Sequence, residues 1–159
     1  MSTISIRTAT PDDREFMFEQ IARLAASAKQ PWHTEFDILA FQHRSMDRIL
    51  RRSRQGTTFI ADDESGAPVG LIQVGLSTDW VTGEPCGYVS VLAVTREMEG
   101  KGVAARLIAA AEEWSRKHGC ALISLDVFAN NERARAFYAK QGYGEETLRL
   151  TKPLSKRKR

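Results

Sequence analysis

The sequence contains little cysteine and no long apolar run. Cys86 and Cys120 are its only cysteines, and neither belongs to a CxxC or Cys/His pattern, so neither a disulfide framework nor a zinc site is indicated. No stretch approaches the ~20 apolar residues that span a bilayer. Residues 1–13 lack the basic start and apolar core of a signal peptide. These absences exclude membrane and secreted classes, and they favour a cytoplasmic protein without a metal.

A broad basic surface is also missing. Lys and Arg total 23 against 20 Asp and Glu, a formal net charge of +3, but residues 156–159 are all basic. The sequence pI of 9.0 therefore results from these four terminal residues, and the rest of the chain is nearly neutral. Nucleic-acid binding is accordingly ranked last among the functions considered. We predict one domain over residues 1–154, followed by a basic, disordered tail over 155–159.

The order of periodic segments predicts a mixed α/β domain. A chain of 159 residues with 42% hydrophobic residues can bury one sizeable core. Residues 88–94 are almost continuously apolar, as in a central strand buried on both faces, and residues 102–118 are dense in Ala and Leu, as in a helix. The other expected strands cover 3–7, 57–61, 69–76, 121–128 (also buried) and 145–154, and the other expected helices cover 10–28, 36–52 and 131–141.

A glycine-rich turn joins the expected strand 88–94 to the expected helix 102–118. Residues 99–104 read EGKGVA, so a helix begins directly after two glycines. Several unpaired backbone N–H groups would then face one point, where they can bind a phosphate. The spacing fits neither a P-loop nor a GxGxxG turn. An ordinary turn at a helix start remains the alternative interpretation.

A second informative segment runs from residue 125 to residue 143. Asn131, Ala134 and Tyr138 stand at positions i, i+3 and i+7, so they share one face of the short helix expected there. Gly142 and Tyr143 follow the helix. The shared face can meet a ligand.

Together the two segments resemble motifs of the GNAT acetyltransferase superfamily, whose members move an acetyl group from acetyl-CoA to an amine. The resemblance implies a mostly antiparallel mixed sheet, splayed at its central strand and flanked by about four helices. It implies that the turn amides hold the CoA pyrophosphate and that the preceding strand bonds the pantetheine arm through a bulge. Glu99 departs from the family pattern, which has Arg or Gln at this position. The cofactor-binding residues implied are Leu92, Ala93, Val94, Glu99, Gly100, Lys101, Gly102, Val103, Ala104, Asn131 and Ala134.

The resemblance also implies catalytic residues. An amine with a reference pKa near ~10.4 must lose a proton before it attacks a thioester, and the departing thiolate gains from a nearby donor. Tyr138 stands at the general-acid position of the family. Asp126 matches the position of the Glu base in bacterial ribosomal-protein N-terminal acetyltransferases. Histone-type members instead carry a Glu at the position of Tyr88, so the identity of the base stays open.

Two segments rich in aromatic and acidic residues match the regions where this family builds its acceptor site. Such residues suit a cationic amine. The expected acceptor-binding residues are Trp32, Glu35, Trp80, Glu84 and Tyr88.

The predicted function is transfer of an acetyl group from acetyl-CoA to a primary amine of a small molecule, or of a protein N-terminus or lysine. The alternative, favoured by Glu99, is a non-catalytic GNAT-fold module that binds acyl-CoA as a sensor or partner. The resemblance allows a homodimer. Fold-level evidence does not choose the acceptor, because acceptor loops vary freely on one fold.

Overall fold

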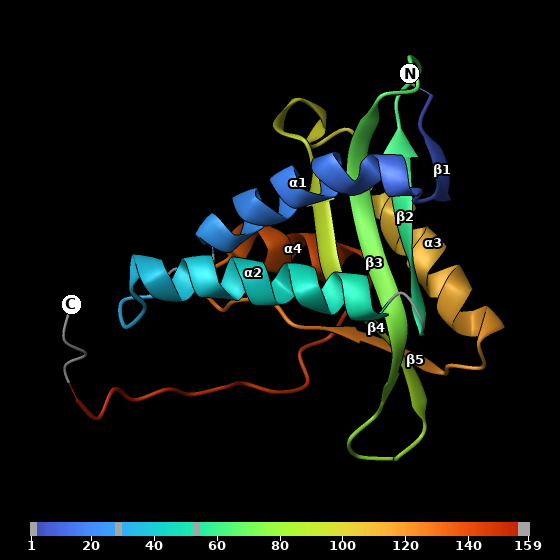
Figure 1. The fold of residues 1–159 in the computed structure, drawn as a ribbon. Coiled ribbons are helices and arrows are strands. Elements are labelled where there is room, and N and C mark those ends of the chain that lie inside the picture. Colours follow the sequence, from blue (N-terminus) through green and yellow to red (C-terminus); the bar gives the residue numbers. More distant parts are fainter. Residues whose placement is uncertain (1–2, 28–29, 53–54, 156–159) are drawn as a thin grey trace.

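One mixed sheet organises the protein, which the computed structural model describes over residues 3–27, 30–52 and 55–155 (Figure 1). The strands lie in the sheet in the order in which they occur in the chain. The first four pair antiparallel, and the fifth runs parallel to the fourth. The strands are β1 (Ser5–Thr8), β2 (Gly56–Asp62), β3 (Pro68–Thr78), β4 (Pro85–Val94) and β5 (Leu122–Leu125).

Four α-helices flank this sheet within the described residues, which confirms the predicted fold class. They are α1 (Arg14–Ser27), α2 (Glu35–Arg52), α3 (Val103–Lys117) and α4 (Glu132–Lys140), with short 3-10 turns η1 (Pro11–Asp13) and η2 (Arg96–Met98). Met17 and Ile21 of α1 pack on one face of the sheet, and Leu107 and Ile108 of α3 pack on the other. Each face therefore has its own apolar layer, called here the α1-side core and the α3-side core.

The two central features of the sheet are a splay and a bulge in β4. Strand β5 pairs with β4 only over Cys86–Val89, so the second half of β4 has no strand on that side in the described part of the chain. Opposite β3, Gln73 pairs with Val91 and Val74 with Val89, which leaves Ser90 as an extra residue. Both features were implied by the family resemblance. They give residues 90–94 an open backbone edge.

Two expected strands differ from the structure. The expected buried strand 121–128 is reduced to Leu122–Leu125, and Leu122 is 53% exposed. The expected strand 145–154 has no regular secondary structure, and it extends away from the body (Figure 1) with Leu148, Leu150 and Leu154 at 73%, 85% and 91% exposure. Alternating apolar residues form a strand only where a neighbouring strand takes up their backbone groups. The predicted tail falls mostly on residues 156–159, which lie outside the described residues.

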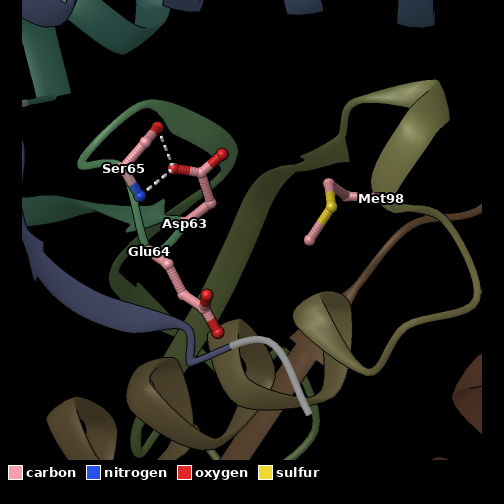
Figure 2. Close-up of a pocket in the computed structure, with 4 residues that line it drawn as sticks. All are labelled: Asp63, Glu64, Ser65 and Met98. Atoms are coloured by element: carbon pink, nitrogen blue, oxygen red, sulfur yellow. Dashed lines mark hydrogen bonds between the residues drawn. The ribbon is translucent and has the colours of Figure 1, made fainter.

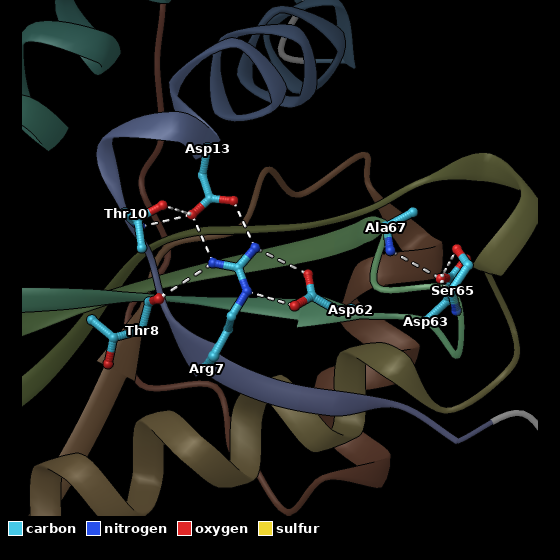
Figure 3. Close-up of polar contacts among 8 residues, drawn as sticks. All are labelled: Arg7, Thr8, Thr10, Asp13, Asp62, Asp63, Ser65 and Ala67. Carbon is cyan, nitrogen blue, oxygen red and sulfur yellow. Dashed lines mark hydrogen bonds and ion pairs between the residues drawn. The ribbon is translucent and has the colours of Figure 1, made fainter.

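The start of the chain is held by one arginine between two aspartates (Figure 3). The Arg7 guanidinium donates from Nη1 and Nη2 to the two Asp13 oxygens, each at 2.8 Å, and from Nε to Asp62 Oδ2 at 2.5 Å. Asp13 is buried, and Thr10 N also donates to it at 2.7 Å. The hydrogen bonds from Arg7 lower the pKa of Asp13 to about 2. This network joins β1, β2 and the entry to α1.

We expect Asp13→Asn to lower the free energy of unfolding by about 2 kcal/mol at neutral pH. The pKa of Asp13 is below its unfolded value of about 3.9, so its contribution is complete above pH ~4 and is lost as the pH falls toward 2. Urea unfolding at several pH values measures this. The exposed neighbour change Asp12→Asn is the control, and equal losses from both variants would contradict a role specific to Asp13.

Candidate functional site

The predicted strand, turn and helix around residues 99–104 are confirmed. Gly100 and Gly102 have φ of +76° and +82°, a conformation that favours glycine. Val103 is buried and anchors the first turn of α3. The first intrahelical bond is donated by Arg106 N to Gly102 O at 3.2 Å, so the N–H groups of residues 102–105 have no acceptor within the helix. Lys101 is exposed beside them. This end of α3 is suited to an anion.

The open edge of β4 leads directly to that helix end. Ala93 is buried in the α1-side core, whereas Leu92 and Val94 are half-buried against the α3-side core. The carbonyl of Val94 accepts a hydrogen bond from Arg23 Nη2 of α1. A long flexible ligand lying on this edge would therefore have backbone groups beside it and a helix N-terminus at its end.

Glu99 is bound between two arginines that sequence reasoning did not identify. Its Oε1 lies 3.2 Å from Arg23 Nη1, and its Oε2 lies 2.5 Å from Arg133 Nη1 of α4. These bonds, first the one from Arg133, lower the pKa of Glu99, so it is ionised at neutral pH. Arg23 and Arg133 stand 76 and 34 residues away in the chain, and no local pattern connects them to the turn.

Helix α4 carries three of the expected site residues, Asn131, Ala134 and Tyr138, and its Tyr138 packs against the α3-side core. Asn131 is the N-cap of α4, and its Oδ1 accepts from Ala134 N at 3.1 Å. Tyr138 is half-buried, with its ring 5.3 Å from Phe137 and 5.7 Å from Tyr143. Burial raises the pKa of Tyr138 to about 12. The hydroxyl therefore stays protonated at neutral pH and can donate a hydrogen bond.

The structure brings the two candidate positions for the base into contact. Tyr88 Oη of β4 donates to Asp126 Oδ2, just after β5, at 2.7 Å. This pair lies where the two paired strands begin to separate. Close to it, Ser90 Oγ of the bulge donates to the buried Gln73 Oε1 at 2.7 Å. Sequence reasoning missed Ser90 and Gln73, because a bulge has no signal in the pattern of a continuously apolar strand.

Apart from Tyr88, which donates to Asp126, the expected acceptor residues fall into two separate groups. Trp32 and Glu35 lie at the connection of α1 to α2, whereas Trp80 and Glu84 lie in the β3–β4 hairpin, which projects from another part of the molecule (Figure 1).

Only the first group adjoins the segment that follows Asp126. Gln30 Nε2 donates to Asn130 Oδ1 at 2.9 Å, and the rings of Phe41 and Phe128 meet edge-on at 6.4 Å. The hairpin is organised instead by the buried Asp79, whose Oδ1 accepts from Thr82 N at 2.6 Å.

A cavity of about 240 Å³ lies elsewhere, between the β2–β3 turn and η2 (Figure 2). Asp63, Glu64, Ser65 and Met98 line it. Hydrogen bonds, first from the Ser65 hydroxyl, lower the pKa of Asp63, and Glu64 Oε1 accepts from Thr3 N at 2.7 Å. Two carboxylates disfavour a phosphate here, so this cavity is not a second candidate for the anion.

Comparisons with known proteins assign the family. The Acetyltransferase (GNAT) family matches residues 18–143. An aminoglycoside N(6')-acetyltransferase type 1 from Stenotrophomonas maltophilia is 29% identical over 94% of this chain and 91% of its own length. An aminoalkylphosphonate N-acetyltransferase from Salmonella typhimurium is 25% identical over 97% of this chain and 94% of its own.

A solved structure of an aminoglycoside N-acetyltransferase, AAC(6')-Iy, in complex with CoA superposes with a TM-score of 0.70. It is 23% identical, over 98% of this chain and 97% of its own, and it shows that the fold is shared. The chain belongs to the GNAT acetyltransferase family. The predicted class, an acetyl-CoA-dependent N-acetyltransferase with acetyl-CoA as cosubstrate, is thereby confirmed.

None of the helices within residues 3–27, 30–52 and 55–155 combines the length and apolarity needed to cross a bilayer. The same residues contain no group of three or more His, Cys, Asp or Glu side chains that could hold a metal ion.

Proposed function

We propose that the protein acetylates a primary amine of a small cationic molecule. The observation that carries this proposal is the Tyr88–Asp126 pair, which places a carboxylate with an oriented hydroxyl where the strands separate. Similarity to enzymes named for aminoglycosides and an aminoalkylphosphonate supports a small amine as acceptor. A protein N-terminus or lysine remains the alternative acceptor, and the cytoplasm remains the expected location.

The residues along the splay fit acetyl-CoA. Its pantetheine arm would lie on the open edge at Leu92, Ala93 and Val94, next to Asn131 and Ala134 of α4. Its pyrophosphate would meet the backbone N–H groups of residues 102–104 at the start of α3. The open backbone edge and these N–H groups both call for a ligand with polar groups along its length.

Different groups of this chain would assist different steps of acetyl transfer. The Asp126 carboxylate attracts the acceptor ammonium and receives, directly or through the Tyr88 hydroxyl, the proton that must leave before attack. A backbone N–H on the open edge of β4 polarises the thioester carbonyl. The Tyr138 hydroxyl donates to the sulfur as the C–S bond breaks. The bond formed is an amide, and the leaving thiolate ends as the thiol.

Thiol release from acetyl-CoA over a panel of amines tests the proposal. We expect turnover with small cationic amines, such as an aminoglycoside or an aminoalkylphosphonate, and none with peptides. Preferential turnover of peptide amines would support the alternative acceptor. Binding of acetyl-CoA without thiol release for any amine would support the non-catalytic module.

With the best amine, we expect Asp126→Asn to lower kcat/KM about three- to tenfold at neutral pH. The loss should shrink as the pH approaches the amine's pKa, because the free amine then forms without help. Glu132→Gln, an equal loss of charge at an exposed site in the first turn of α4, is the control. A loss that is the same at every pH would contradict a role for Asp126 in proton removal.

We also propose that the protein forms a homodimer through residues 145–154. This segment is extended and exposes Leu148 and Leu150, while the outer edge of β5 has no strand partner in the described part of the chain. The segment of each copy can therefore pair with the β5 edge of the other, which satisfies both sets of backbone groups.

We expect a chain ending at Gly144 to be monomeric by light scattering, whereas the full chain is dimeric. Leu150→Lys should weaken the dimer, and Thr151→Lys, which adds the same charge on the opposite side of the segment, should not. A monomeric full chain would contradict the proposal.

A further inference from the structure

Glu99 places a negative charge next to the expected pyrophosphate site. A carboxylate one residue before the glycine turn should repel a phosphate. In the structure it forms a bridge from Arg23 of α1 to Arg133 of α4, with distances of 3.2 and 2.5 Å. The three side chains together carry a net charge of +1. The turn therefore remains cationic despite the carboxylate.

The bridge lies at the turn where the CoA pyrophosphate is expected. Glu99 belongs to the turn that follows the open edge of β4, Arg133 belongs to the first turn of α4, and their ion pair connects the two. Arg23 reaches the same place from α1 and donates to the Val94 carbonyl at the end of that edge. The Glu99–Arg133 pair thus closes the gap between the turn and α4.

Arg23 is also incompletely bonded. Its Nε is buried and has no hydrogen-bond partner among the described residues, although its Nη atoms bond Glu99 and Val94. A guanidinium presents its donors in a planar fork that fits the oxygens of a phosphate. A phosphate oxygen arriving at this point would supply the missing acceptor.

From these contacts we propose that Glu99 holds Arg23 and Arg133 in the free enzyme and releases them to the CoA pyrophosphate when the cosubstrate binds. The proposal rests on the proposed cofactor site. Arg133 has a 73% exposed side chain, and an ion pair so exposed to solvent is weak, so little opposes its exchange for a doubly charged pyrophosphate. The two arginines then supply the positive charge that an arginine at position 99 would provide in the family pattern.

The test is a double-mutant cycle on CoA affinity measured by calorimetry. We expect Arg133→Gln to weaken CoA binding about five- to tenfold and Glu99→Gln to tighten it about two- to fivefold. In the Arg133→Gln background, Glu99→Gln should tighten CoA binding less than it does in the wild-type protein, because only the exchange of Arg23 remains. Equal tightening in both backgrounds would mean simple repulsion by Glu99 and would overturn the exchange, as would an unchanged Kd in Arg133→Gln.

The choice of ligands and a control variant locate the contact. Dephospho-CoA keeps the pyrophosphate, so it should lose as much affinity as CoA in Arg133→Gln, whereas a loss confined to CoA would place Arg133 on the 3′-phosphate and overturn the proposal. Arg135→Gln removes the same charge from the same helix, where Arg135 pairs with Glu145 at 2.6 Å, and it should leave CoA affinity unchanged. Failure of the wild-type protein to bind CoA would reject the cofactor site itself, a result distinct from failure of the exchange.

Discussion

Replacing Tyr138 with phenylalanine should lower kcat roughly 10- to 1000-fold under saturating acetyl-CoA, with little change in acetyl-CoA affinity. The ring would keep its contacts with Phe137 and Tyr143, so packing is preserved. Only the hydroxyl donor is lost. Because the pKa of Tyr138 is about 12, its proton is held more tightly than that of a thiol with a reference pKa near ~8.5. The hydroxyl therefore stabilises the thiolate mainly as a hydrogen-bond donor, which places the effect toward the lower end of the range.

The neighbouring tyrosine provides a matched control for this measurement. Tyr143 is half-buried in the same aromatic cluster, and its hydroxyl lies 3.4 Å from Glu112 Oε1 of α3. Tyr143→Phe should therefore leave kcat within about twofold of the wild-type value. Melting temperatures of both variants report on folding. Wild-type kcat in a stable Tyr138→Phe variant would assign protonation of the thiolate to solvent.

Replacing Gly102 with aspartate should raise the Kd for acetyl-CoA about 10- to 100-fold, and tenfold corresponds to about 1.4 kcal/mol. No atom lies within 4 Å of a Cβ placed there, so the side chain meets no clash, although the φ of +82° strains any residue with a side chain. The new carboxylate would occupy the helix end where the pyrophosphate is expected. Its negative charge is also favourable at the start of a helix, which helps the variant to fold.

Gly119→Asp separates this charge effect from backbone strain. Gly119 has a φ of +76° with open space around it, and it follows the opposite end of α3. This variant should lose at least as much stability, because a carboxylate is unfavourable at a helix C-terminus, but it should bind acetyl-CoA with an unchanged Kd by calorimetric titration. Equal weakening of acetyl-CoA binding in both variants, or no weakening in Gly102→Asp, would contradict a pyrophosphate site at the start of α3.

The elements that could be predicted from the sequence are those with a distinctive residue pattern of their own. Helix α3 is amphipathic over several turns, and β4 is a buried apolar strand, so tertiary context agrees with local pattern. The glycines of the turn were identified because positive φ restricts the choice of residue.

What could not be predicted depends on partners distant in the chain. The segment 145–154 has the alternation of a strand, but only a neighbouring strand determines whether it becomes one. The Arg23–Glu99–Arg133 bridge joins three separate elements. The two candidate positions for the base, Tyr88 and Asp126, were considered as alternatives, although the parallel pairing of β4 with β5 brings them into contact.

The extra residue in β4 also determines which codon deletions this strand can tolerate without losing its core contacts. Val89 packs in the α3-side core, whereas Val91 and Ala93 pack in the α1-side core, although an unbroken strand would place all three on one face. Ser90 produces this reversal. Loss of the single codon for Ser90 would leave Val89 and Val91 adjacent and on opposite faces, where they already lie, so it would remove the bulge and keep the core contacts on both sides. Loss of a codon elsewhere in the strand, such as that of Leu92, would instead turn core residues to the wrong face. Changes in the length of this strand are therefore expected to be tolerated at the bulge alone.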